Sequence, residues 1–258
     1  MQSVMQPILE ATHITKTFHE HGGSRFRAVD DISLTVREGE CVGIVGESGS
    51  GKSTMARIVT RLILSDSGSV KLCGEELTTA KGAALRAAYR NMKMIFQEPR
   101  SSFDSRLTLG ESICEALKPV MADKKARMEA AGRLLCSVSL NEDFLSFYPG
   151  QVSGGECQRA AIARALAQKP KLLICDEATS ALDVSVQAQI IALLNEIRRE
   201  QQLSLLFISH DLALVSSFCD RLYVLYEGKV VEEGETAQVI QNPRQPYTKK
   251  LIDSVLSV

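Results

Sequence analysis

GESGSGKST, residues Gly46 to Thr54, is the stretch that decides the fold of this chain. It fits the pattern G-x-x-x-x-G-K-[ST] and follows the continuous apolar run CVGIVG. Glycines let successive backbone N–H groups surround a phosphate, Lys52 reaches the outer phosphate oxygens, and the Ser53 hydroxyl binds Mg²⁺. We therefore predict a buried strand, a phosphate-binding loop and a helix from about Lys52 to Leu64. The residues expected to surround the phosphates are Gly46, Glu47, Ser48, Gly49, Ser50, Gly51, Lys52, Ser53 and Thr54.

A second apolar run, KLLICDE, ends in two carboxylates, Asp176 and Glu177. A phosphate loop needs an acidic partner on a neighbouring strand that holds Mg²⁺ through water, and Asp176 is expected to fill that role together with Ser53. Glu177 leaves the end of the strand, where its carboxylate can act as the general base for a water that attacks the γ-phosphate. In the absence of a phosphate loop, the same residues would be a strand followed by a solvated acidic turn.

The segment VSGGECQR, Val152 to Arg159, places two glycines behind a serine at the expected start of a helix. Ser153 and Glu156 match the S-x-x-E capping box, in which each side chain bonds a backbone N–H of the other residue. Two consecutive glycines destabilise a helix start and expose N–H groups that an anion can approach closely. Gly154 and Gly155 therefore suggest a ligand, although a helix cap alone accounts for the serine and the glutamate.

Elsewhere strand patterns alternate with helix patterns, which predicts an α/β fold with a largely parallel sheet. Partial period-two alternation over residues 8–17 and 31–36, and a short strand between glycines at 68–74, predicts an antiparallel β layer in the first third of the chain. Strands return at KLLICDE and LSLLFISH, and RLYVLYEGKVVEEG predicts a hairpin that short helices follow.

The middle of the chain lacks strand patterns. Between residues 103 and 169, apolar residues recur at helical spacing in ESICEALKPVM and ARMEAAGRLLCSV. We expect a helical subdomain at 103–169 that is inserted into an α/β core made of residues 1–102 and 170–258, with a short C-terminal tail at 242–258.

Composition narrows the class of protein. Lys and Arg number 30 against 31 Asp and Glu, and no run of like charge occurs, so no nucleic-acid partner is expected. The apolar runs are shorter than the roughly 18 residues that a membrane helix requires, and no signal pattern opens the chain, which favours the cytosol. The seven cysteines form no C-x-x-C pair, which argues against a disulfide framework and a zinc site.

Five motifs, GESGSGKS, VSGGECQR, KLLICDE, SALD and ISHD, occur in the order and at the spacing of the ATP-binding cassette (ABC) ATPases. The chain resembles that family over nearly its whole length. The resemblance implies that ATP and Mg²⁺ are bound, and that Ser153, Gly154 and Gly155 contact the γ-phosphate of ATP held by the phosphate loop of an opposing subunit. The nucleotide then lies between two subunits placed head to tail, so one helix start serves as both cap and phosphate site.

The resemblance also implies roles for single residues. Phe18 in KTFHEH stacks on adenine, with Phe26 as a less favoured substitute. Gln97 in MIFQEP senses Mg²⁺ and couples to the membrane subunit. Asp183 in SALD contacts the opposing phosphate loop, and His210 in ISHD bonds the γ-phosphate.

One branch of the family is especially similar. QEPRSSFDSRLTLGESI, SALDVSVQAQII and NPRQPYTKKLI resemble the ATPase subunits of bacterial oligopeptide, dipeptide and nickel importers. That branch implies a peripheral protein on the cytoplasmic face of the inner membrane, with two permease subunits and, indirectly, an extracytoplasmic binding protein. It also implies a second ATPase subunit, for which a paralogue is favoured over a copy.

The cargo is not readable from these residues, so a peptide, nickel and a nickel chelate all stay open. A nickel site at His19-Glu20-His21 is disfavoured, because two histidines with no third ligand in view make a poor metal site. A solvated loop is the preferred interpretation of this segment.

Two other classes of function remain as alternatives. One is an ABC ATPase without a transport role, such as a subunit of a phosphonate-processing complex or a DNA- or ribosome-linked mechanical protein, although the chain has no long coiled coil, tandem cassette or basic insertion. The other is a P-loop kinase or GTPase, which would reduce the serine-glycine-glycine loop to a helix cap and offers no guanine-reading segment. The importer ATPase is the function that the motifs favour.

Overall fold

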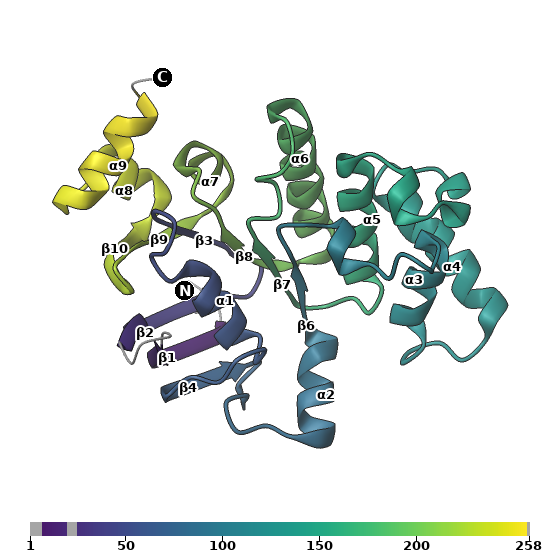
Figure 1. Cartoon of the computed structure of the whole chain (residues 1–258), viewed down its shortest axis with the longest axis horizontal. Helices are drawn as coiled ribbons and strands as arrows, with labels where there is room; N and C mark the ends of the chain where they lie inside the picture. The colour runs from purple at the N-terminus through teal and green to yellow at the C-terminus, as the bar shows by residue number, and fades with distance from the viewer. Residues whose placement is uncertain (1–6, 20–24, 257–258) are drawn as a thin grey trace, which may run out of the picture.

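A computed structural model describes residues 7–19 and 25–256, and Figure 1 shows two β-sheets with helices around them. The larger sheet has six strands, in the spatial order β10 (Lys229–Glu235), β9 (Arg221–Tyr226), β3 (Cys41–Val45), β8 (Ser204–Ile208), β7 (Leu172–Asp176) and β6 (Met92–Ile95). All neighbours pair in parallel except β10, which forms an antiparallel hairpin with β9 at one edge. The α/β class and the predicted C-terminal hairpin are confirmed.

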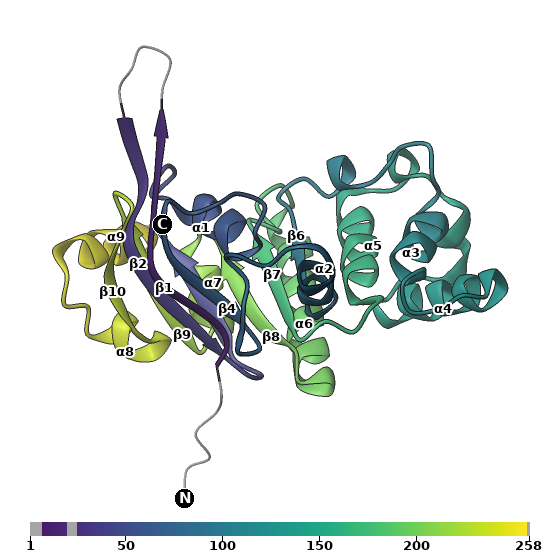
Figure 2. The same cartoon turned by 90° about the horizontal axis from the view of Figure 1, so that it is seen from below.

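The smaller sheet is antiparallel. Its strands lie in the order β2 (Arg25–Arg37), β1 (Pro7–His19), β4 (Ser67–Leu72) and β5 (Glu75–Glu76). Apolar side chains of this sheet share one core with helix α1 (Lys52–Val59) and with buried residues of β3, β7 and β8. The helix that follows the phosphate loop is thus enclosed between the two sheets, which fixes the position of the loop (Figure 2).

Helix α1 is shorter than the sequence predicts. It ends at Val59 instead of near Leu64, because Arg61 adopts a left-handed backbone with φ of 62°. Leu62 and Leu64 are each 52% exposed, so their apolar character does not reflect a buried helical face.

Three elements carry no clear sequence pattern: α2 (Gly82–Asn91), β6 (Met92–Ile95) and α7 (Leu212–Phe218). No residue of α2 is buried, so its core-facing pattern is weak. Strand β6 follows α2 without a turn, and only four residues define it. The prediction of a parallel sheet therefore lacked its edge strand.

Helices occupy the chain between β6 and β7 and flank the large sheet. Those between β6 and β7 are η1 (Arg100–Ser102), α3 (Leu109–Leu117), α4 (Lys124–Ser137), η2 (Glu142–Ser146), η3 (Pro149–Gln151) and α5 (Gly154–Leu166). Helix α6 (Val184–Gln201) lies between β7 and β8, and α8 (Thr236–Gln241) and α9 (Pro246–Leu256) follow β10. Figure 2 shows α3, α4 and α5 at the opposite end of the molecule from β1 and β2. No helix in the described parts of the chain is long and apolar enough to cross a membrane.

Candidate active site

The phosphate loop connects β3 to α1. Gly46, Gly49 and Gly51 adopt φ values of 151°, 83° and 100°, a region that side chains disfavour. A Cβ at Gly46 would overlap the carbonyl oxygen of Leu225, and one at Gly51 would overlap the carbonyl oxygen of Ala28. The close approach of neighbouring strands therefore requires glycine at both positions.

The Lys52 ammonium is held inside this loop. It donates hydrogen bonds to the carbonyl oxygens of Gly46 (2.8 Å) and Glu47 (2.7 Å), and Lys52 is only 4% exposed. Burial lowers the pKa of Lys52, while the nearby carboxylates of Glu177 and Asp176 oppose that shift. Neutral carbonyls are weaker acceptors than phosphate oxygens, so the ammonium is prepared to bind a phosphate.

Ser53 and Asp176 meet beside the loop. The Ser53 hydroxyl donates to Oδ1 of Asp176 at 2.9 Å. Burial raises the pKa of Asp176 and the neighbouring Glu177 carboxylate adds to the effect, while the Ser53 hydrogen bond opposes it. A cation would relieve this unfavourable burial of charge, and two hard oxygen donors suit Mg²⁺, which usually keeps water and phosphate as its other ligands. The residues present fit the ion.

Glu177 and His210 come together from neighbouring parallel strands. Glu177 follows β7 with a left-handed φ of 49°, and its amide donates to the carbonyl of Ile208 at 2.9 Å. This backbone geometry brings Oε1 of Glu177 to 3.5 Å from Nδ1 of His210, which follows β8. The sequence predicts both residues at this site, and the fold places them side by side.

A cavity of about 380 Å³ lies against the phosphate loop. Its walls come from four separate segments and comprise Phe26, Ala28, Ser48, Gly49, Gly51, Lys52, Ser53, Thr54, Gln97 and Glu177. Phe26 lines the cavity, whereas Phe18, its partner in the β1–β2 register, is not among the lining residues. Phe26 is thus the phenylalanine that borders this cavity, while the adenine contact that the resemblance implies for Phe18 stays a prediction.

The predicted capping box at the start of α5 is present. The Glu156 amide donates to Oγ of Ser153 at 3.3 Å, and the Ser153 amide donates to Oε2 of Glu156 at 2.7 Å. The hydrogen bond from the Ser153 amide holds the pKa of Glu156 below its usual range. Both hydrogen bonds of the capping box are therefore formed by residues of the same chain.

Close packing explains one of the two glycines. A Cβ at Gly155 would lie 2.6 Å from Cγ1 of Val186, whereas a Cβ at Gly154 would lie 3.3 Å from the end of the Leu182 side chain. Packing against Val186 of α6 therefore gives Gly155 a structural reason of its own, while the phosphate contact that the resemblance implies for both glycines stays a prediction. A side chain at Gly154 would have more room than one at Gly155.

Models of two protein families match the sequence. The ABC transporter model matches residues 29–180, more than half of the chain, and a model described as oligopeptide/dipeptide transporter, C-terminal region, matches residues 231–258. The chain belongs to the ABC transporter family. It is an ABC-type ATPase, and it binds ATP.

Relatives and solved structures agree with this assignment. The ABC ATPase is 46% identical to the oligopeptide transport ATP-binding protein OppF of Escherichia coli K12, over 89% of this chain and 69% of that protein. It is 42% identical to the glutathione import ATP-binding protein GsiA of Pectobacterium atrosepticum, over 97% of this chain and 41% of that one. A dimeric structure of the ATP-binding cassette MJ0796 bound to ADP and Pi has a TM-score of 0.80 and 30% identity, over 88% of this chain and 98% of that chain.

In this ABC ATPase, the glycine-rich loop at Ser153 does not line the cavity beside the phosphate loop. Ser153, Gly154, Gly155 and Asp183 are absent from the cavity lining. Figure 1 shows α5 apart from α1, on the other side of β7. Asp183 instead caps α6, where it accepts hydrogen bonds from the Ser185 hydroxyl (2.7 Å) and the Val186 amide (3.0 Å), which lower its pKa.

Sequence patterns did not point to Tyr247 as a neighbour of the phosphate loop. Its hydroxyl accepts a hydrogen bond from the Glu47 amide at 3.0 Å. Tyr247 belongs to NPRQPYTKKLI, a stretch that indicates the branch of the family and carries no chemical pattern of its own. In the disfavoured nickel motif, His19 is described, whereas Glu20 and His21 lie outside the described residues. Within the described part of the chain, no group of three or more His, Cys, Asp and Glu residues is placed to hold a metal.

Proposed function

We propose that this chain is the ATPase subunit of an importer that takes up peptides through membrane permeases, bound peripherally at the cytoplasmic face of the inner membrane. The observation that carries the proposal is the match of residues 231–258 to the oligopeptide/dipeptide transporter C-terminal region. That segment lies outside the part of the chain that matches the general ABC transporter model. Relatives named for oligopeptide and glutathione import support a peptide over nickel as cargo.

The proposed chemistry follows from the residues around the cavity. Lys52 binds the β- and γ-phosphates. Ser53, Gln97 and, through water, Asp176 would hold Mg²⁺, which would neutralise phosphate charge when bound. Glu177 accepts the proton of the attacking water, and His210, beside it, bonds the γ-phosphate.

The role of Glu177 is separable from nucleotide binding. Glu177→Gln is expected to leave ATP affinity unchanged and to lower hydrolysis at least about 100-fold, because an amide is not a base. Phosphate release by the assembled transporter is the measurement, and Glu75→Gln, at an exposed carboxylate of β5, is the control. Near-normal turnover in Glu177→Gln would contradict the assignment.

Phe26 is proposed to stack on adenine, because it lines the cavity. Loss of one base–aromatic contact is worth about 1–3 kcal/mol, so Phe26→Ala should weaken ATP affinity by about 5- to 100-fold. Phe18→Ala is the matched control. A larger loss of ATP affinity in Phe18→Ala than in Phe26→Ala would show that Phe18 stacks on adenine, as the resemblance implies.

Ser153, Gly154, Gly155 and Asp183 are proposed to contact ATP on an opposing ATPase subunit. They lie outside the cavity of their own chain, and Ser153 presents a helix N-terminus, whose N–H groups and dipole favour anions. A solved relative of the same fold is described as dimeric. A paralogue is proposed as the opposing subunit, as in the importer branch that the sequence resembles.

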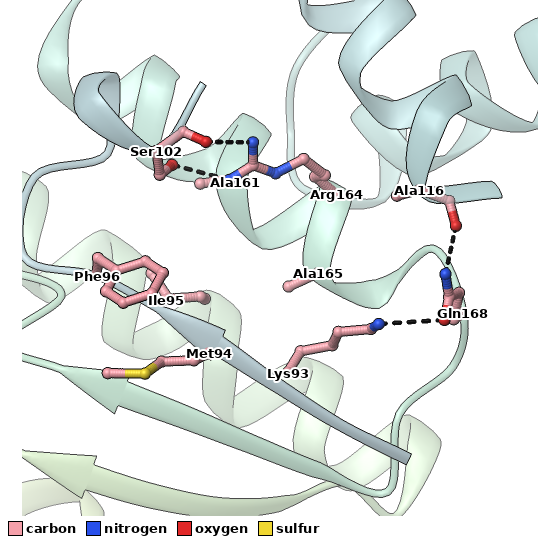
Figure 3. Close-up of a pocket in the computed structure, with 10 residues that line it drawn as sticks. All are labelled: Lys93, Met94, Ile95, Phe96, Ser102, Ala116, Ala161, Arg164, Ala165 and Gln168. Carbon is pink, nitrogen blue, oxygen red and sulfur yellow. Dashed lines mark hydrogen bonds between the residues drawn. The ribbon is translucent and has the colours of Figure 1, made fainter. Parts of the chain in front are cut away.

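A pocket between β6 and α5 is proposed as part of the permease contact, where the proposed helical subdomain at residues 103–169 meets the core (Figure 3). Its volume is about 210 Å³, and the described residues that line it include two cations and no carboxylate. Lys93 donates to Oε1 of Gln168 at 3.1 Å, and Arg164 donates to the Ser102 carbonyl at 2.7 Å. Burial lowers the pKa of both cations, so an acidic side chain on a permease loop would complement them.

The importer function is tested by uptake of labelled peptides in cells. Deletion of the gene should abolish uptake of di- and oligopeptides, the wild-type gene should restore it, and Glu177→Gln should not. Nickel uptake is measured in parallel, because loss of nickel uptake alone would identify nickel as the cargo. Loss of neither uptake would contradict the importer function.

A further inference from the structure

We propose that Tyr247 is a positioning residue for the phosphate loop, and that the C-terminal region from β10 to α9 serves to hold Tyr247 against that loop. The inference rests on ATP binding at this loop and is independent of the cargo. The inference gives a structural role at the nucleotide site to a region whose sequence is otherwise typical of one branch of the family.

The hydrogen bond to Tyr247 acts on a peptide unit that Lys52 also holds. The Gly46–Glu47 peptide accepts the Lys52 ammonium at its oxygen (2.8 Å) and donates its N–H to the Tyr247 hydroxyl (3.0 Å). When Lys52 turns to a phosphate, the bond at the oxygen is released. The bond to Tyr247 then remains to keep the first turn of the loop in place.

Tyr247 is itself fixed by the C-terminal region. Its ring packs on Tyr226 of β9, with the ring centroids 4.3 Å apart. The buried Glu232 carboxylate on β10 accepts hydrogen bonds from the amides of Arg244 (2.8 Å) and Gln245 (3.0 Å), which immediately precede α9. Strand β10 thereby holds the helix start that carries Tyr247.

The turn that leads into this region contacts the loop at a second point. The Gly228 amide, in the turn between β9 and β10, donates to the Ser50 carbonyl at 3.1 Å. Both Glu47 and Ser50, near the two ends of the phosphate loop, are thus bonded to the C-terminal part of the chain. Figure 1 shows β9 and β10 at the sheet edge next to β3, from which the loop emerges.

Tyr247→Phe tests the inference because it removes the hydroxyl and keeps the ring. A neutral hydrogen bond contributes about 0.5–1.5 kcal/mol, so the affinity for both ATP and ADP should fall by about 2- to 10-fold. The turnover number at saturating ATP should not change, because Tyr247 does not line the cavity. Tyr226→Phe is the matched control, since it deletes a hydroxyl from the same ring pair and leaves the hydrogen bond from the Glu47 amide to Tyr247 in place.

Three measurements on the full chain separate positioning from general destabilisation. Affinity is measured by titration with a fluorescent ATP analogue and with ADP, stability by thermal unfolding, and loop opening by hydrogen exchange of a peptide spanning residues 46–52. The expected result for Tyr247→Phe is weaker binding and faster exchange with an unchanged melting temperature, while Tyr226→Phe resembles wild type.

Equal affinity of Tyr247→Phe and wild type would overturn the inference and leave ATP binding intact. Weaker binding that accompanies a lower melting temperature and faster exchange throughout the chain would also overturn it, because the role would then be structural. A wild-type chain that binds no nucleotide would reject the nucleotide site as a whole, and this inference with it.

Discussion

The two glycine-rich loops of this chain both lead into helices and differ in what their own chain supplies. The phosphate loop has three glycines at positive φ, its helix has no side-chain cap, and a buried lysine sits in its curve beside a cavity. The loop at Ser153 has a complete capping box, and its second glycine packs tightly on Val186. The first loop thus borders a cavity of its own chain, whereas the second forms a capped helix start away from that cavity and is proposed to act on an opposing subunit.

Lys52→Ala is expected to have the largest effect, because it removes the only ammonium among the described residues that line the phosphate-loop cavity. Hydrogen bonds to charged groups contribute about 1.5–3 kcal/mol each, so ATP affinity should fall at least about 100-fold, and turnover should be lost. Nucleotide titration with Mg²⁺ present measures the change, with the exposed Lys118→Ala as control. Unchanged affinity would mean that the first loop is only a helix start.

Gly155→Ala tests whether packing explains the second loop. The added methyl would meet Val186 at 2.6 Å, and overpacking of this kind costs about 1–3 kcal/mol of unfolding free energy. Gly154→Ala, with more room, should lose less. Urea denaturation compares the two variants. Adding Val186→Ala should relieve the loss in Gly155→Ala, and failure of that rescue would remove the packing explanation.

Glu156→Gln is expected to have the smallest effect. Glutamine serves the capping box as well as glutamate does, so only the favourable charge near the helix N-terminus is lost, worth less than about 1 kcal/mol. ATP hydrolysis by the assembled transporter should stay close to wild type. A loss as large as that in Lys52→Ala would show that the Glu156 carboxylate acts beyond the cap.

The comparison also shows where sequence patterns succeed. The phosphate loop, Asp176 and Glu177 were predictable because the chemistry demands particular residue types at fixed local spacing, and the capping box is equally local. Strand β6, the end of α1 and the position of Phe26 at the cavity were not, because tertiary packing decides them. Arg61 ends α1 by its backbone conformation, and Phe26 gains its place through strand pairing. Tyr247 reaches Glu47 across 200 positions of sequence, which no local pattern encodes.

The ATP affinity of the isolated Gly154→Asp chain tests the central claim most directly, namely that the two loops serve different nucleotides. A carboxylate at residue 154 would repel a phosphate placed there, because like charges disfavour each other. If that phosphate belongs to an opposing subunit, the isolated variant should bind ATP as wild type does, while the assembled transporter should not hydrolyse it. If Gly154→Asp instead loses ATP affinity in isolation as Lys52→Ala does, both loops hold one nucleotide and the account is contradicted.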